Sequence, residues 1–382
     1  MYVTNLSSKV FTCKENRMKH IIKDVVINYF KEIHALVVEE ELHKNSWHTD
    51  LHYKIMVNGN RYSARFINSD RIINSAFGAL SNEQLKEQVR FTYYLREHGI
   101  PFMQIKENMA GDCFTLLTWN EEQYRFVLST WMEGEHVTYC TETMAEVLGK
   151  EARKIHDISS MFQSSTFQKR SHLDGYGEFI KLLENKGGTC KKLRGYIDLA
   201  KYHIECAHTS DLEFIVQTDL NPLNVIWDAN QCVKGIIDFE SIGYVDRMEG
   251  LAFLIKWYSR TEGIGSHVVC SEVTRAFLKG YGNNNILTIN DYKRLSSLLW
   301  LSGSLNWNFV KKTMSLLGDE SELEKHLRVY KIRGENLSVL VSRERANSYK
   351  EVFLLYTNYF FGNVFCTNAF VITDYFRKGY NL

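Results

Sequence analysis

Two carboxylates and one amide stand close together in the stretch 213–241, where they could act jointly on a phosphate group. Asp219 and Asn224 are five residues apart in a polar loop, and Asp238 follows the apolar run 233–237. Short apolar runs broken by turn residues are typical of strands, so we expect a small hairpin here. The three polar side chains would then converge from the ends of neighbouring strands.

This set of groups suits phosphoryl transfer, in which a protein mainly positions the reactants and neutralises charge through Mg²⁺. Asp219 would accept the proton of an attacking hydroxyl. Asn224 and Asp238 would hold the metal, because Mg²⁺ prefers oxygen ligands. The alternative is an ordinary turn, in which Asp and Asn are common. The apolar-apolar-Asp-Phe run that follows favours the catalytic interpretation.

The same stretch resembles the aminoglycoside phosphotransferase and choline-kinase-like group of small-molecule kinases. That group has the pattern H-G-D-x-x-x-x-N, then a hairpin, then I-D-F or I-D-W. Here the letters are QTDLNPLN at 217–224, IDFE at 237–240 and GYVDR at 243–247, so Gln217 stands where histidine is usual. The resemblance implies an α+β, bilobal, protein-kinase-like fold. Its N-lobe would be β-rich, with five strands and one main helix, and its C-lobe mostly helical.

Strand patterns and helical patterns divide near residue 133. We therefore expect an N-terminal nucleotide-binding lobe at 1–133 and a C-terminal catalytic and substrate-binding lobe at 134–382. Asn58-Gly59 is a strong hairpin signal between two alternating runs. The patterns also predict strands at about 101–107, 112–119 and 123–131, and late helices near 267–281, 290–316, 320–331 and 335–360.

A phosphate-holding cation is implied by the resemblance on the strand expected at 61–67. Arg65 is the candidate there, since a guanidinium can grip phosphate oxygens with two parallel bonds. A solvent-facing arginine is the alternative. Gln88 falls where the family's helix carries a glutamate that pairs with this cation, and Glu87 is adjacent. Either side chain could serve as the partner.

Two further segments are expected at the nucleotide. Ser46 and Thr49, in a loop without glycine, could donate hydroxyls to the phosphates, although a plain hairpin loop fits this loop equally well. Backbone groups from Thr130 to Met132 would contact the adenine, because this run is similar to the family's hinge between lobes.

Composition excludes several other classes of protein. The net charge of +1 over 382 residues gives no electrostatic case for a nucleic-acid or membrane partner. Eight cysteines without C-x-x-C spacing fit reduced thiols, and neither a signal peptide nor a membrane span is evident, so we expect a cytoplasmic protein.

The resulting hypothesis is an ATP- or GTP-dependent, Mg²⁺-requiring O-phosphotransferase. It would act on a hydroxyl of a small molecule, either an antibiotic, which makes it a resistance kinase, or a metabolite of the choline, homoserine or thiamine type. It would work as a monomer or homodimer. A degenerate kinase-like binding protein is the alternative, motivated by Gln217 and Gln88. Acidic residues that could bind a cationic substrate, or form a solvated face, are Glu262, Glu272, Glu320 and Glu322.

Overall fold

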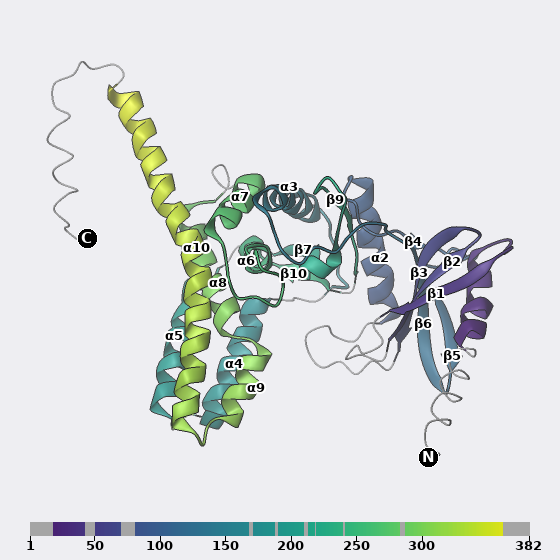
Figure 1. The fold of residues 1–382 in the computed structure, drawn as a ribbon, viewed down its shortest axis with the longest axis horizontal. Helices are drawn as coiled ribbons and strands as arrows, with labels where there is room; N and C mark the ends of the chain where they lie inside the picture. Colours follow the sequence, from purple (N-terminus) through teal and green to yellow (C-terminus); the bar gives the residue numbers. More distant parts are fainter. Residues whose placement is uncertain are drawn as a thin grey trace, which may run out of the picture.

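The computed structural model describes residues 18–42, 50–69, 81–167, 171–187, 190–209, 213–217, 219–239, 241–282 and 287–361, with the backbone alone described at 215–217 and 342–361. An antiparallel sheet lies at one end of the molecule and a larger helical region at the other (Figure 1). The architecture is therefore α+β, with a β-rich first part and a mostly helical second part, as the sequence predicts.

The N-terminal sheet has the strand order β1-β2-β3-β6-β4, with β5 paired to β6. Its strands are β1 (Leu36–Leu42), β2 (Leu51–Val57), β3 (Asn60–Asn68), β4 (Ile105–Lys106), β5 (Thr115–Trp119) and β6 (Glu122–Thr130). The sheet thus has six strands rather than five. The expected strand at 101–107 is reduced to the two residues of β4, because residues 101–103 bond to the backbone of Ile236 and not to the sheet.

Alternation along β3 separates the two faces of the sheet. Ala64 and Phe66 are buried in a core with the N-terminal helix at 18–26, whereas Ile67 is buried on the opposite face, in the core that contains α2 (Asn82–Glu97). Arg65 lies between Ala64 and Phe66 and therefore points to the α2 face. A 3₁₀ turn, η1 (Ile27–Tyr29), directly follows the N-terminal helix.

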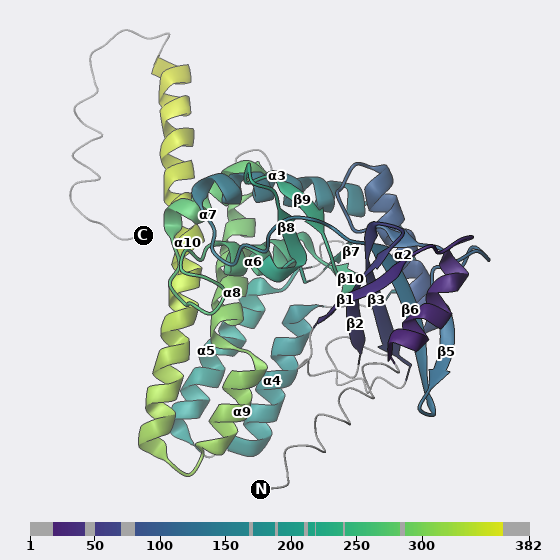
Figure 2. The same cartoon turned by 45° about the vertical axis from the view of Figure 1, so that its right-hand side comes forward.

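The helical region begins with α3, whose N-terminus is capped by the Thr141 side chain. Its helices are α3 (Glu142–Ser159), α4 (His172–Gly187), α5 (Lys191–Ala207), α6 (Arg247–Tyr258), α7 (Ser271–Tyr281), α8 (Ile289–Ser304), α9 (Trp307–Ser315) and α10 (Glu320–Phe361). Helices α4, α5, α8, α9 and the first half of α10 lie side by side, and α10 continues past them (Figures 1 and 2).

Two predicted helix boundaries are wrong, each for a local reason. The helix expected at 290–316 is two helices, because the Asn306 side chain accepts the Phe309 N–H at 2.9 Å and starts α9 anew. The helices expected at 320–331 and 335–360 are one, α10, which runs through Gly334. A Cβ at Gly334 would lie 2.8 Å from the Trp300 carbonyl oxygen, so this glycine permits close packing on α8 rather than ending a helix.

Four short strands lie between α5 and α6 and carry the polar loop. They are β7 (Phe214–Gln217), β8 (Val225–Trp227), β9 (Val233–Ile236) and β10 (Ile242–Val245). The predicted hairpin is β8–β9, while β7 pairs with β10. Among the described residues, no helix combines the length and apolar character needed to cross a bilayer.

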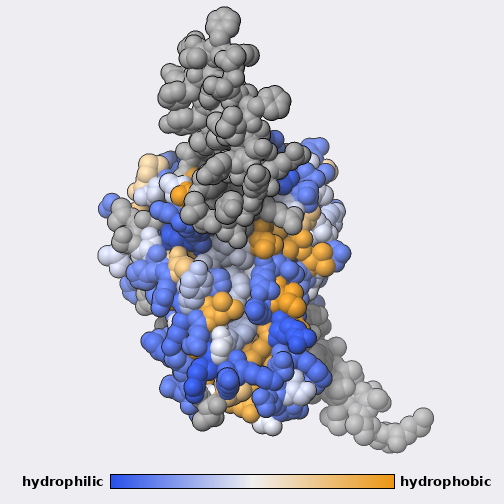
Figure 3. Space-filling model, turned by 90° about the vertical axis from the view of Figure 1, so that its left-hand side faces the viewer, coloured by the Kyte–Doolittle hydropathy of each residue, from blue (hydrophilic) through white to orange (hydrophobic). Residues whose placement is uncertain are grey.

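The surface beside α10 is mostly hydrophilic, with separate hydrophobic patches among the polar side chains (Figure 3). Val329, Ile332 and Val339 of α10 are each about half exposed. Isolated apolar side chains of this kind are ordinary on protein surfaces.

Helices α3 and α7 approach each other closely through one glycine on each. A Cβ at Gly149 would collide with the carbonyl oxygen of Phe277, and one at Gly280 with the carbonyl oxygen of Glu146. Any side chain at either position would therefore push the two backbones apart.

We expect Gly280→Ala to lower the free energy of unfolding by about 2 kcal/mol, because overpacking of a close contact outweighs the better helix propensity of alanine. Gly195→Ala in α5 is the matched control, since no atom lies within 4 Å of its added Cβ. That variant should gain about 0.5–1 kcal/mol. Urea unfolding of both variants measures the contrast, and equal effects would contradict the close packing of α3 on α7.

Candidate active site

Hydrogen bonds within the loop after β7 fix the position of Asp219. The Asn224 side-chain Nδ2 donates to the Asp219 carbonyl oxygen at 2.7 Å, and the Asn221 Nδ2 donates to Asp219 Oδ1 at 3.0 Å. Asn221 also accepts the Leu223 N–H at 2.8 Å, which caps the turn η2 (Pro222–Asn224). Pro222 suits the first position of such a turn, where no N–H is needed.

Asp238 is tied to the same loop through the backbone. The Ile237 N–H donates to the Asn224 carbonyl oxygen at 2.9 Å, so the residue before Asp238 is fixed to the residue that ends η2. Asp238 itself has a φ of +68°, a left-handed conformation that Asp tolerates better than most residues. Phe239, which follows, is fully buried and anchors the turn. The structure thus brings Asp219, Asn224 and Asp238 together at one end of the β8–β9 hairpin.

Burial raises the pKa of the Asp219 carboxyl, while the Asn221 hydrogen bond and the positive charge of Lys256 lower it. Lys256 lies on α6, the helix that follows the hairpin, and sequence reasoning missed it. One signal was present, because Lys256 is a charged residue inside the apolar run 251–258. Asn221 was also missed, although its Asx-turn geometry is common in such loops.

Arg65 forms an ion pair with an acid that does not come from α2. Its guanidinium Nη2 lies 3.1 Å from Asp50 Oδ2, and the exposed fractions of the two side chains are 16% and 0%. Asp50 Oδ1 also accepts the Asn68 N–H at 3.1 Å. Asp50 directly precedes β2, and the register Leu51↔Phe66 places it diagonally across from Arg65 on the same face.

The two α2 residues considered as partners of Arg65 behave differently. Glu87 is bonded to Arg90, with oxygen-to-nitrogen distances of 2.6 and 2.7 Å, and Arg90 holds the pKa of this carboxyl below its usual value. Gln88 is 2% exposed and lies on the side of α2 that faces the core. The charge that balances Arg65 is therefore that of Asp50, a residue the sequence did not single out.

The segment expected at the adenine passes close to the β8–β9 hairpin. The Thr130 N–H bonds to the Gln104 carbonyl oxygen at 2.9 Å, and the Trp131 N–H to that of Arg61 at 3.1 Å. The Met132 side chain packs onto Gly235 of β9, where a Cβ would collide with it. Ser46 and Thr49, and the side chain of Gln217, lie outside the part of the chain that the structure describes.

Helix α6, which follows the hairpin, is held in place by contacts at its N-terminus. Its N-cap, Asp246, accepts the N–H groups of Met248 and Glu249 and forms an ion pair with Arg294 at 3.2 Å. Glu249, one turn further on, bonds to the start of α4: its carboxylate accepts the His172 N–H at 2.6 Å. Burial and the charge of Asp246 raise the pKa of Glu249 to about 7.

Asn224 and Asp238 are the residues that could hold a divalent cation. The described residues contain no cluster of three His, Cys, Asp or Glu side chains suited to a metal. Mg²⁺ does not need one, since it usually takes one or two protein oxygens and completes its shell with water and substrate phosphates. The Asn224 Nδ2 is committed to the Asp219 carbonyl, so Oδ1 is the amide atom left to face a metal. The residues present therefore fit Mg²⁺ bound together with a nucleotide.

We expect Arg65→Met to lower the free energy of unfolding by about 3 kcal/mol, because it leaves the Asp50 carboxylate buried without its counter-charge. The double variant Arg65→Met/Asp50→Asn should recover part of this loss. Arg61→Met, on the same strand but 48% exposed, is the control and should cost less. Denaturant unfolding of this cycle measures the coupling, and additive effects of the two substitutions would refute a strong pair.

Comparisons with known proteins give the family. A model of the family described as "Phosphotransferase enzyme family" matches residues 58–296. No curated protein matches the chain by sequence.

Solved structures share the fold along most of their length. The amicoumacin kinase hAmiN, solved in complex with AMP-PNP, is 15% identical, with a TM-score of 0.57 over 85% of this chain and 96% of the other. An aminoglycoside phosphotransferase from Alicyclobacillus acidocaldarius is 12% identical (TM-score 0.57, 86% and 96% covered), and a microcompartment-associated aminopropanol kinase is 13% identical (0.57, 86% and 98%). At these identities the likeness shows the fold. Because the family model spans more than half of the chain, the chain belongs to the phosphotransferase enzyme family.

Proposed function

We propose that this phosphotransferase transfers the γ-phosphoryl group of ATP or GTP, with Mg²⁺, to a hydroxyl of a small molecule. The observation that carries the proposal is the loop in which Asn224 bonds to the Asp219 backbone and Ile237 bonds to Asn224. This network holds one candidate base and two candidate metal ligands in a fixed relation. An ordinary turn would need no such connection to the next strand.

In the proposed reaction, the acceptor hydroxyl oxygen attacks the γ-phosphorus while the bond to the nucleoside diphosphate breaks. Asp219 takes the hydroxyl proton and later passes it to water. Bound Mg²⁺ would neutralise charge on the phosphate oxygens. Asn224 and Asp238 would supply its protein ligands. Burial that raises the pKa of Asp219 makes it a better proton acceptor than an exposed aspartate.

The nucleotide would lie between the N-terminal sheet and the catalytic hairpin. Arg65 would bind a phosphate, held in place by Asp50, and Gln88 would hydrogen-bond its guanidinium. Backbone groups from Thr130 to Met132 would contact the adenine. In this proposal, residues 1–133 are the nucleotide-binding lobe and residues 134–382 the catalytic and substrate-binding lobe.

The similar kinases support a nucleotide donor and a small acceptor. The amicoumacin kinase was solved with AMP-PNP, a nucleotide analogue, and the aminopropanol kinase is named for an amino alcohol. The first relative is named for amicoumacin and the second for a small amino alcohol, and we propose both an antibiotic and a metabolite as candidate acceptors. We propose a cytoplasmic enzyme, acting as a monomer or homodimer without a nucleic-acid or membrane partner.

The direct test is nucleotide turnover with Mg²⁺ against a panel of hydroxyl-bearing antibiotics, amino alcohols and hydroxy acids. Mass spectrometry would detect the gain of one phosphate on the acceptor, and comparison of ATP with GTP would name the donor. A phosphorylated product supports the proposal. Binding of Mg²⁺-nucleotide without product on any panel member would count against it.

We expect Asp219→Asn to lower kcat by about 10²–10⁴-fold, the contribution typical of a positioned general base, with little change in nucleotide Kd. The same substitution in the exposed turn of the hairpin, Asp228→Asn, is the control, since Asn can keep the bonds that Asp228 accepts from Asn230 and Cys232. Steady-state kinetics and nucleotide titration measure the two effects. Parallel losses of kcat and affinity in Asp219→Asn would reject the role of base.

We expect Asp238→Asn to weaken Mg²⁺-dependent nucleotide binding by at least about tenfold, because a charged oxygen ligand is replaced by a neutral one. Asn also tolerates the left-handed conformation at this position, so the backbone is retained. Calorimetric titration of the nucleotide with and without Mg²⁺ measures the metal-dependent part. An unchanged Mg²⁺ effect would remove Asp238 from the metal site.

A further inference from the structure

A cavity of about 240 Å³ lies between α4, α6, α8 and the start of α9, on the helical side of the catalytic loop. Its walls are largely aromatic: Tyr176 and Phe179 come from α4, Phe253 from α6 and Trp307 from α9. His172 and Phe253 are stacked at 5.4 Å and also line a smaller cavity that reaches Leu220, the residue after Asp219. The two cavities therefore share a wall, and the smaller one reaches the residue next to the proposed base.

Lys256 is the one lysine or arginine among the residues that line this cavity. Within the described part of the chain, its ammonium group forms neither a salt bridge nor a hydrogen bond, and it lies 5.5 Å from the ring centroid of Trp257. A half-buried cation in an aromatic pocket is costly unless an anion accompanies it. Burial accordingly lowers its pKa to about 8, and the charge of Asp219 opposes this shift.

The other titratable groups of the cavity do not balance this charge. The Glu249 carboxylate is committed to α4, where it accepts the Ser171 hydroxyl at 2.8 Å and the His172 N–H at 2.6 Å. Burial and the charge of Lys256 lower the pKa of His172 to about 4, so this imidazole is neutral near pH 7. Arg260, one turn beyond Lys256, adds further positive charge and lowers the Lys256 pKa.

The four acidic residues that the sequence suggested as ligands of a cationic substrate lie outside this cavity. Glu320 and Glu322 are ion-paired to Lys192 and Lys325 on the surface, and Glu262 and Glu272 are bonded to nearby serine hydroxyls. None of the four lines the cavity. A polycationic acceptor would therefore meet Lys256 rather than an acidic wall.

We infer that the acceptor is a hydroxy acid with an apolar body, whose carboxylate binds Lys256 while its hydroxyl faces Asp219. This inference rests on the proposed phosphotransfer at Asp219. The aromatic walls would bury the apolar body, and the ammonium group would form a charge-assisted hydrogen bond with the carboxylate. The geometry disfavours aminoglycoside-like polyamines, whose repeated positive charge Lys256 would repel.

Matched ligands separate the carboxylate from the rest of the molecule. The probes are 3-phenyllactate, 2-hydroxyisocaproate and mandelate, each compared with its neutral amide and with the corresponding amino alcohol. Calorimetric binding to the full chain with Mg²⁺ and AMP-PNP tests the pocket, and turnover with ATP tests phosphorylation. We expect at least one acid to bind tenfold or more tightly than its amide, the effect typical of a hydrogen bond to a charged group, and the amino alcohols to bind most weakly.

Variants then assign the effect to Lys256. Lys256→Met should remove the preference for acid over amide and raise the acceptor KM, with the nucleotide KM unchanged, whereas Lys256→Arg should retain the preference. Lys181→Met on α4, whose side chain is 68% exposed, is the matched control and should behave as the unmodified protein. Because the Lys256 pKa is about 8, acid binding should also weaken as the pH rises through 8, and amide binding should not.

Other outcomes would distinguish a failure of the hydroxy-acid inference from a failure of the proposed phosphotransfer. A raised nucleotide KM in Lys256→Met, with the acid preference retained, would assign the lysine to the donor phosphates. Phosphorylation of amides or amines in preference to acids would refute the hydroxy-acid inference and leave the proposed phosphotransfer standing. Lys256-dependent binding of acids without any phosphorylated product would support the pocket and count against the phosphotransfer. Equal binding of acids and amides would overturn the inference outright.

Discussion

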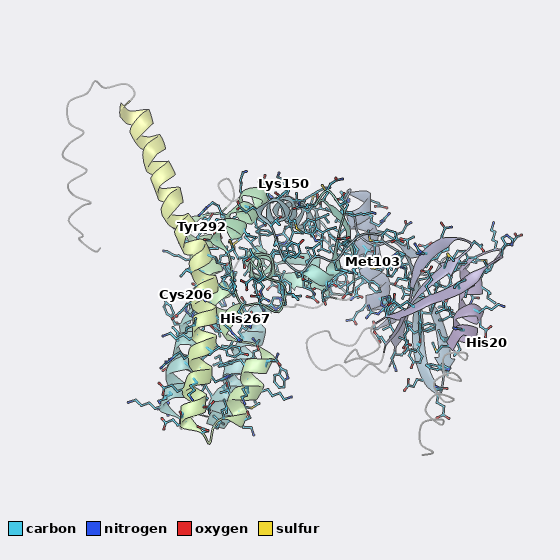
Figure 4. The ribbon with its side chains drawn as sticks, in the orientation of Figure 1. His20, Met103, Lys150, Cys206, His267 and Tyr292 are labelled. Atoms are coloured by element: carbon cyan, nitrogen blue, oxygen red, sulfur yellow. The ribbon has the colours of Figure 1, made fainter. Side chains whose placement is uncertain are left out.

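The β8–β9 hairpin is hydrogen-bonded along both of its outer edges, and the candidate active site depends on these bonds. On one edge, Ile236 bonds to the backbone of Pro101 and Met103, with both nitrogen-to-oxygen distances at 2.8 Å. On the other, Trp227 and Glu135 exchange bonds of 2.9 and 3.0 Å. The first of these segments, 101–103, follows α2, and the second, at Glu135, follows β6. Met103 lies where the sheet meets the helical region (Figure 4). The first segment is thereby fixed to β9, the strand that leads to Asp238, and the second to its partner strand β8.

Two glycines make this arrangement sterically possible. A Cβ at Gly134, which has a φ of +153°, would lie 2.6 Å from the Trp227 carbonyl oxygen and would clash with Ile226. Gly235 leaves room for the Met132 side chain on the same hairpin. The segment proposed to contact adenine is therefore in direct contact with the strand proposed to carry a metal ligand. Movement of the sheet relative to the helical region would have to break these contacts or carry the hairpin along.

The sequence was informative where local pattern and chemistry coincide. The β8–β9 hairpin and the α+β architecture follow from short-range signals, and the structure confirms them. The pairing of β7 with β10 joins residues distant in sequence, and no local pattern reveals it. The Arg65–Asp50 ion pair lies across the β2–β3 hairpin, so it could have been found from the register of that hairpin. Gly334 shows a related limit, because a glycine that ends one helix and a glycine that lets a helix pack closely are identical in sequence. The roles of Arg65, Gln88 and the residues near Asp219 stay predictions.

Helix α6 connects the loop of the candidate base Asp219 to the proposed acceptor cavity through one continuous element. Its first residues receive the Asp246 cap and the Arg294 ion pair, which fix the helix directly behind the strand β10. Glu249 then holds the start of α4, so the aromatic side chains of α4 face the same cavity as those of α6. Lys256 follows two turns later on the side of Asp219. Because α6 supplies both part of the cavity wall and its lysine, a substitution on its inward side would change the proposed acceptor preference while the hydrogen bonds of the loop at 219–224 remain in place.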